Sequence, residues 1–227
     1  MTKLIVALDF DTINDAYALT DKLAPEQCIV KVGSEMYTRF GPAFVESLVA
    51  KQYKVFLDLK FHDIPNTVAN ACKAAADLGV WMLNVHALGG QAMMSAAAQA
   101  LATYGAKRPL LIAVTILTST HPNALSAVGL NKPLLEQVLQ LAHLASQAGL
   151  DGVVSSAQEV SALKKQQGQD FLVITPGIRL QENTYDDQAR VVTPEEAFHL
   201  GSDYIVVGRP ITQATDPKAV VQSILNP

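Results

Sequence analysis

Short apolar runs rich in β-branched residues recur along this chain, and this repetition limits the folds open to it. The runs are continuous rather than alternating, as expected of parallel strands buried on both faces. They cover residues 4–9, 29–33, 55–60, 81–86, 110–117, 152–156, 172–177 and 204–209. Helical patterns follow them at residues 15–23, 42–51, 68–78, 90–104, 134–148, 157–166, 194–200 and 217–225. Such an alternation of strands and helices predicts an α/β fold with a parallel sheet.

The number of strands favours one closed (β/α)8 barrel, a TIM barrel, over any other parallel architecture. A chain of 227 residues, 49% of them hydrophobic and 17% charged, suits a single domain over residues 1–227. A doubly wound open sheet is the alternative. No Gly-x-Gly-x-x-Gly occurs in the sequence to support it.

The charge of the chain bears on its partners and its location. A formal net charge of −4 gives no global basic field for nucleic acid or an anionic membrane. The N-terminus lacks a signal sequence and no apolar run is long enough for a membrane span, so we expect a cytoplasmic protein. The two cysteines, Cys28 and Cys72, form neither a metal-ligand cluster nor a disulfide framework.

The densest group of charges lies at the end of the third strand, in the sequence DLKFHDIPNT at residues 58–67. Because strand side chains alternate between faces, Asp58 and Lys60 should point the same way. Asp63 follows just past the strand end. Burying such charges is costly, so either a structural salt bridge or a reaction must account for them.

Polar residues also follow the other strands at their carboxyl ends, where barrel enzymes keep their active sites. They include Asp9, Lys31, Asn84, His86, Thr115, Thr118, Arg179 and Arg209. Two connections, residues 118–133 and 179–193, are longer than ordinary loops, and loops of this kind often act as lids. We therefore predict a site at this rim of the barrel.

The ends of the seventh and eighth strands resemble a phosphate site, which barrels commonly build there. Gly177 and Gly208 permit close backbone approach, while Arg179 and Arg209 supply positive charge. Gln188, in the long loop, could fold over a ligand. No Glu or Cys stands at ligand spacing from His62 or His86, so we expect no metal site.

Residues 58–67 closely resemble the signature of the orotidine 5′-monophosphate decarboxylase family. The similarity continues in order through Ala7-Leu8-Asp9, Lys31, residues 115–118, residues 176–179 and residues 207–210. This resemblance implies a carboxy-lyase that converts orotidine 5′-monophosphate to UMP in de novo pyrimidine biosynthesis. It also implies that the reaction needs no cofactor and that the barrel works as a homodimer with shared active sites.

The resemblance further implies roles for individual residues. Lys31, Asp58, Lys60 and Asp63 would form an alternating charged array, with Lys60 donating a proton to C6 of the pyrimidine. Asp63 would reach into the neighbouring subunit's site. The remaining implied contacts are Asp9 and Lys31 to the ribose, Thr67 from the dimer partner, Thr118 to the pyrimidine, and Gln188, Gly208 and Arg209 to the phosphate, with Arg179 nearby.

Two other functions remain open on the same barrel. A related sugar-phosphate enzyme, such as a hexulose-phosphate synthase or a pentose-phosphate epimerase, would need a metal to stabilise an enediolate. A catalytically silent protein would bind UMP without turnover. Lys31 and the run from Asp63 to Thr67 favour the decarboxylase.

Overall fold

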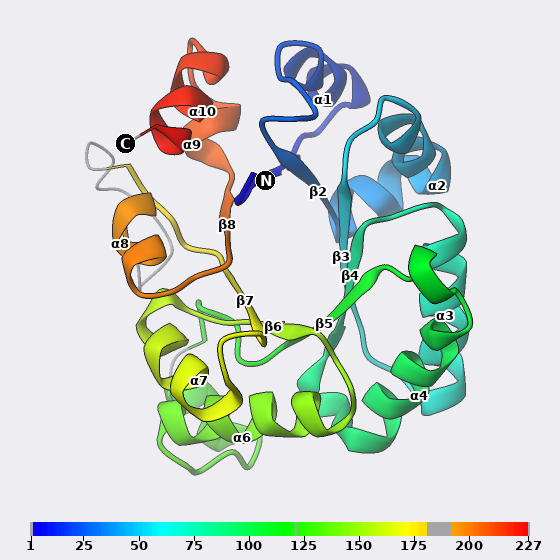
Figure 1. Ribbon diagram of the computed structural model, residues 1–227, viewed down its shortest axis with the longest axis vertical. Coiled ribbons are helices and arrows are strands. Elements are labelled where there is room, and N and C mark those ends of the chain that lie inside the picture. Colours follow the sequence, from blue (N-terminus) through cyan, green and yellow to red (C-terminus); the bar gives the residue numbers. More distant parts are fainter. Residues whose placement is uncertain (1, 121, 181–191, 227) are drawn as a thin grey trace.

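The chain folds into a closed barrel of eight parallel strands with helices on the outside (Figure 1). The computed structural model describes residues 2–120, 122–180 and 192–226. The strands are β1 (Leu4–Ala7), β2 (Ile29–Gly33), β3 (Val55–Phe61), β4 (Met82–His86), β5 (Leu110–Val114), β6 (Gly152–Val154), β7 (Leu172–Thr175) and β8 (Tyr204–Val207). Each strand pairs with the next, and β8 returns to β1, where Ile205 pairs with Leu4. The predicted (β/α)8 barrel is confirmed, and the open sheet is excluded.

The helices follow the strands around the ring. They are α1 (Ile13–Thr20), α2 (Ser34–Ala50), α3 (Pro65–Asp77), α4 (Gly90–Ala102), α5 (Pro122–Ala127), α6 (Leu134–Gln147), α7 (Val160–Gln167), α8 (Pro194–His199), α9 (Arg209–Thr212) and α10 (Pro217–Leu225). Short 3₁₀ turns occur at η1 (Ala87–Gly89), η2 (Gly105–Lys107) and η3 (Ala157–Glu159). No helix in the described part of the chain is long and apolar enough to cross a membrane.

Three helices depart from the predicted pattern. α2 begins at Ser34 rather than at residue 42, and Gly41, with φ of 65°, breaks it before Pro42. A glycine followed by a proline usually ends or begins a helix. The hydrophobic pattern therefore indicates a helix that begins at Pro42, and the half of α2 before Gly41 was not predicted. α5 and α9 were not predicted, because helices this short contain too few residues to show a repeating pattern of apolar side chains.

The side chains that point into the barrel are apolar in the interior and, on some strands, polar at the carboxyl end. The interior cluster consists of Ile5, Ile29, Phe56, Met82, Ile112 and Ile174. Side chains two residues farther along a strand point to the same face. On β2, β3 and β4 those positions are Lys31, Asp58 and Asn84. The charged groups of these strands therefore lie directly above the interior core.

The amino ends of the strands carry partly buried ion pairs of a different kind. Lys164 Nζ lies 2.7 Å from Asp203 Oδ2, and the same oxygen accepts a hydrogen bond from Val173 N. Asp151 makes the corresponding contacts with Arg108 and with Leu111 N. These carboxylates join strand starts to their neighbours at the face of a barrel that usually serves stability.

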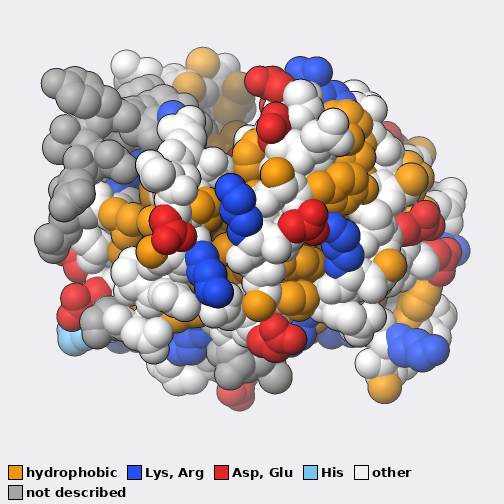
Figure 2. All heavy atoms as spheres, turned by 90° about the horizontal axis from the view of Figure 1, so that it is seen from above, with side chains coloured by type: hydrophobic (Ala, Val, Ile, Leu, Met, Phe, Trp, Pro, Cys, Tyr) orange, Lys and Arg blue, Asp and Glu red, His pale blue; other side chains and the backbone are white. Residues whose placement is uncertain are grey.

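The outer surface mixes charges of both signs. On the face seen in Figure 2, lysine and arginine side chains are interspersed with acidic ones, and apolar side chains lie between them. The face therefore presents no continuous basic field.

Candidate active site

A cavity of about 370 Å³ opens at the carboxyl ends of the strands, where the sequence predicts the site. Its floor contains Phe56, Val114 and Val154 from the barrel interior. The predicted site residues that line it are Asp9, Lys31, Asp58, Lys60, Thr118, Arg179, Gly208 and Arg209. A cavity of this volume, with an apolar floor and a few charged groups, suits a small molecule the size of a nucleotide.

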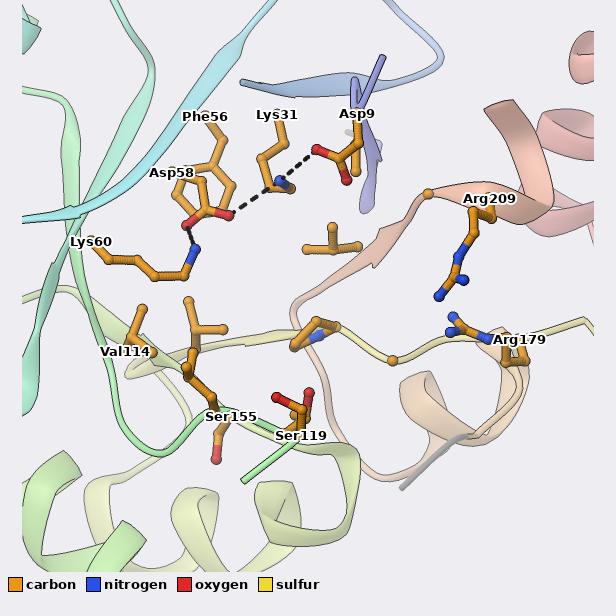
Figure 3. Close-up of a pocket in the computed structure, with 18 of the residues that line it drawn as sticks. Asp9, Lys31, Phe56, Asp58, Lys60, Val114, Ser119, Ser155, Arg179 and Arg209 are labelled. Carbon is orange, nitrogen blue, oxygen red and sulfur yellow. Dashed lines mark hydrogen bonds and ion pairs between the residues drawn. The ribbon is translucent and has the colours of Figure 1, made fainter. Parts of the chain in front are cut away.

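Four charged side chains on one side of the cavity form a continuous chain of ion pairs (Figure 3). Lys60 Nζ lies 2.7 Å from Asp58 Oδ1, and Lys31 Nζ lies 3.2 Å from the other oxygen of the same carboxylate. Lys31 Nζ also lies 3.5 Å from Asp9 Oδ1. The side chains of Lys31 and Asp58 are each 12% exposed, whereas Asp9 is 62% exposed.

Mutual contact keeps the two buried members of this chain charged. Burial alone would raise the pKa of Asp58. The charges of Lys31 and Lys60, with hydrogen bonds from Lys60 and Asn84, outweigh burial and place that pKa below its usual value. Burial likewise lowers the pKa of Lys31, but Asp58 and Asp9 outweigh it, so the pKa lies above its usual value.

The backbone at Lys60 departs from a regular strand. Lys60 has φ of 52°, in the left-handed region, and the β3–β4 pairing shifts between Leu57 and Phe61. The amide N–H of Lys60 donates to Asn84 Oδ1 at 2.8 Å instead of to a strand neighbour's backbone. Lys60 and Asp58 do face the same cavity, as predicted, but a strand irregularity rather than simple alternation brings Lys60 there.

The opposite side of the cavity holds two arginines. Figure 3 shows the guanidinium groups of Arg179 and Arg209 pointing toward each other, across the cavity from Lys60. Gly177 and Gly208 line the same side, just before these arginines. Two cations that converge on one space favour a shared anion there.

The segment that bears Arg179 is fixed where it leaves β7. Ile178 forms an isolated parallel bridge with Val192, and Arg179 N donates to Val192 O at 3.0 Å. The two ends of the long connection therefore meet beside the cavity. Gln188, predicted to fold over a ligand, lies outside the described residues.

Asp63 and Thr67 do not line this cavity. Both are exposed, Asp63 between β3 and α3 and Thr67 in the first turn of α3. Asp63 Oδ1 accepts a hydrogen bond from Ile64 N at 2.6 Å. The cavity of a single chain thus brings together the other predicted residues that the structure describes, but leaves these two on the surface.

Sequence reasoning did not assign two lining residues, Ser119 and Ser155, to the site. Asn84 was named among the polar residues at the strand ends without a role; it supports the charged chain from beneath the cavity. Asn84 has a detectable signal, since it is a polar residue at an inward-facing position of an otherwise apolar strand. Thr115, by contrast, is fully buried and donates to Val154 O, so it packs within the barrel wall.

The two histidines near the site stack on each other rather than gather metal ligands. The rings of His62 and His86 lie 5.6 Å apart at 27°. Burial lowers the pKa of His86, and His62 and Lys60 contribute in the same direction. Among the described residues, no three His, Cys, Asp or Glu side chains come together as a possible metal site.

A comparison with known protein families identifies the family of this chain. Residues 2–224 match the family model described as "Orotidine 5'-phosphate decarboxylase / HUMPS family". The chain belongs to this family. The resemblance drawn from residues 58–67 is confirmed over nearly the whole length.

Curated members of the family are close in sequence. The orotidine 5′-phosphate decarboxylase of Legionella pneumophila (strain Paris) is 59% identical over 223 residues, covering 98% of this chain and 97% of that protein. The enzyme of the same name from Pseudoalteromonas atlantica is 57% identical over 222 residues, covering 98% and 96%.

The fold is equally close to a solved member. The crystal structure of orotidine 5′-phosphate decarboxylase from Lactobacillus acidophilus matches with a TM-score of 0.88 at 43% identity. The match covers 98% of this chain and 96% of that one.

Proposed function

We propose that this protein is a carboxy-lyase that decarboxylates orotidine 5′-monophosphate to UMP, without a cofactor, in pyrimidine biosynthesis. The observation that carries the proposal is the chain of contacts from Lys60 through Asp58 to Lys31 along one side of the cavity. Family membership, and the same name on relatives at 57–59% identity, support the choice of substrate.

The chemistry requires stabilisation of a carbanion. When the bond between C6 and the carboxylate carbon breaks, CO2 leaves and the electron pair remains on C6 of the pyrimidine. The ammonium of Lys60 stabilises that charge and then transfers a proton to C6, and the lysine regains a proton from water. Fixed charges that favour the developing carbanion lower the barrier, and each tenfold in rate needs only about 1.4 kcal/mol.

Asp58 and Lys31 hold the proton donor in place. Asp58 accepts a hydrogen bond from Lys60 Nζ while its second oxygen contacts Lys31, so the carboxylate cannot turn without losing one partner. In the proposed complex Lys31 and Asp9 contact the ribose, and Thr118 contacts the pyrimidine. Fixed positions of this kind avoid reorganisation when the reaction occurs.

The arginine side of the cavity suits the 5′-phosphate. Arg179 and Arg209 converge there, and Gly208 lets the backbone approach. Gln188 completes this phosphate site in the proposal, with the connection after β7 closing over the ligand. Binding energy from the phosphate, at the far side from Lys60, then orders the site around the reacting carbon.

The proposal includes a homodimer with shared sites, in which Asp63 and Thr67 complete the partner's cavity. Both residues lie on an exposed segment outside their own cavity. Two apolar side chains near them are also exposed, Ile64 at 66% and Leu88 at 40%. The stacked rings of His62 and His86 join the two segments that carry these side chains, which supports a common contact face.

The reaction is tested by following the absorbance of orotidine 5′-monophosphate with purified protein in a buffer that contains a chelator. The proposal predicts that the protein converts orotidine 5′-monophosphate to UMP at the same rate with and without the chelator. A folded protein that leaves the substrate unchanged would contradict it.

The second candidate is a sugar-phosphate reaction, such as that of a hexulose-phosphate synthase. The description of the matched family names a second group, HUMPS, beside orotidine 5′-phosphate decarboxylase, so the family is not limited to one reaction. Activity on hexulose or pentose phosphates that appears only with an added divalent metal would identify it. Tight binding of UMP without any turnover would indicate the catalytically silent alternative.

A further inference from the structure

Asn84 is a fully buried side chain that contacts two members of the charged chain at once. Its Nδ2 donates to Asp58 Oδ1 at 2.7 Å, and its Oδ1 accepts from Lys60 N at 2.8 Å. It is 0% exposed and stands above Met82, at an inward-facing position of β4. Both ends of the amide are therefore used, and both are used on residues of the proposed reaction.

The contact fills a gap in the sheet. Leu57 pairs with Leu83 and Phe61 pairs with Val85, so residues 58–60 of β3 lie opposite Asn84 alone. Lys60 adopts φ of 52° at this point. A left-handed conformation at a non-glycine residue persists only where its surroundings fix it, and such residues gather at functional sites. The side chain of Asn84 supplies the acceptor that the irregular strand lacks.

We propose that Asn84 is a positioning residue, which sets the direction of the Lys60 side chain and fixes the Asp58 carboxylate beneath it. This inference deepens the proposed decarboxylation and rests on it. Asn84 stays neutral, so it holds both residues without adding charge to the array. A leucine of similar size would fill the space but leave Lys60 N without its acceptor.

The electrostatic consequence is a shift in the pH dependence of turnover. Asp58 is faced by Lys31 from β2, by Lys60 from β3 and by Asn84 from β4, while Asp9 acts on it through Lys31. Removing the N–H that Asn84 donates favours protonated Asp58. The acid limb of the kcat profile should therefore move to higher pH in Asn84→Leu.

The experiment compares the unaltered protein, Asn84→Leu, Asn84→Asp and a matched control. The control is Thr175→Val, since Thr175 is fully buried and hydrogen-bonded to Ser202 Oγ at 2.7 Å but does not line the cavity. Asn84→Asp retains an acceptor for Lys60 N but sets a second carboxyl group against Asp58 in place of the N–H donor, which raises the pKa of the pair, so the acid limb should again move to higher pH. We expect kcat to fall roughly hundredfold in both Asn84 variants, with UMP affinity changed by no more than a few fold, and kcat to stay unchanged in Thr175→Val.

Amide hydrogen exchange over residues 58–62 provides a second readout, independent of turnover. It should quicken in Asn84→Leu, and stay slow in Asn84→Asp and Thr175→Val. Slow exchange in Asn84→Leu, or a kcat and pH profile like those of the unaltered protein, would overturn the inference. If the unaltered protein shows no turnover, the proposed function fails, and exchange alone then decides whether Asn84 fixes the Lys60 backbone. Should Asn84→Leu not fold, Asn84→Asp carries the kcat and pH test.

Discussion

Lys60 Nζ lies 2.7 Å from Asp58 Oδ1, while the second oxygen of that carboxylate lies 3.2 Å from Lys31 Nζ. One aspartate thus serves two lysines in the wall of a cavity whose other side carries Arg179 and Arg209. A purely structural ion pair would not need to line a cavity. The arrangement fits a site that must hold a cation beside a reacting carbon and an anion some distance from it.

Replacing Asp58 should cost stability in a pH-dependent way. Asp58→Asn leaves Lys31 and Lys60 without their shared counter-charge, and we expect a loss of about 3 kcal/mol in the free energy of unfolding near neutral pH. Because the pKa of Asp58 is lowered in the folded protein, its contribution is present above its unfolded pKa and is lost as pH falls through the folded one.

Urea unfolding of both proteins from pH 3 to pH 9 measures this. The difference in stability should be constant above roughly pH 5 and shrink below roughly pH 4. Because the pKa of Lys31 is raised in the folded protein, its contribution is fully present below the usual pKa of a lysine, so Lys31 does not change the difference between pH 3 and pH 9. A difference that does not change down to acid pH would mean that the charge of Asp58 is not what stabilises the fold.

Arg209→Ala should weaken capture of the phosphate. We expect KM for orotidine 5′-monophosphate to rise roughly tenfold or more, because a charge-assisted contact to the phosphate is lost. With orotidine, which lacks the phosphate, kcat/KM of Arg209→Ala should equal kcat/KM of the unaltered protein. The matched control is Arg39→Ala on α2, whose surface pairs with Asp11 and Glu35 lie outside the cavity. An equal loss with both substrates would contradict the phosphate assignment.

Mixed dimers test the role of Asp63. Inactive Lys60→Ala and Asp63→Ala subunits, combined after mild denaturation, should regain about one quarter of normal activity. Half of the dimers would then be mixed, and each would contain one intact site. Subunit exchange is verified with a tag on one variant. Proven exchange without recovered activity would show that Asp63 acts in its own subunit or not at all.

Lys164→Met should affect stability and leave turnover intact. Lys164 is 7% exposed and paired with Asp203 at the amino ends of the strands, away from the cavity. Losing the lysine leaves a carboxylate with one fewer partner, and we expect about 3 kcal/mol of destabilisation. Thermal unfolding checks the stability, and kcat per folded molecule should be unchanged. A fall in kcat would mean that this end of the barrel reaches the site.

The barrel and much of its site follow from local sequence pattern. Eight buried runs separated by helices predict the closure, and strand parity places Lys31 and Asp58 inward above the core. The left-handed turn at Lys60 did not follow, because it depends on Asn84 from the next strand. A contact between residues 24 positions apart is set by the register of two strands, and no local pattern encodes that register.

The places of Asp63 and Thr67 could be inferred only from the family resemblance. Both lie beyond the strand end, where alternation no longer fixes a direction, and a single chain leaves them on its surface. In the proposed homodimer, the cavity that they would complete depends on how the two chains assemble. Residue spacing in one chain holds no information on that assembly.

The most direct test of Lys60 as the proton donor is the single-turnover rate of Lys60→Ala, with the protein in excess over orotidine 5′-monophosphate, measured beside Lys164→Met. Both substitutions remove a lysine Nζ that lies 2.7 Å from an aspartate oxygen, at opposite ends of the barrel. We expect Lys60→Ala still to bind UMP but to form no measurable product, and Lys164→Met to turn over normally. UMP formation by Lys60→Ala at a rate near that of Lys164→Met would contradict Lys60 as the proton donor.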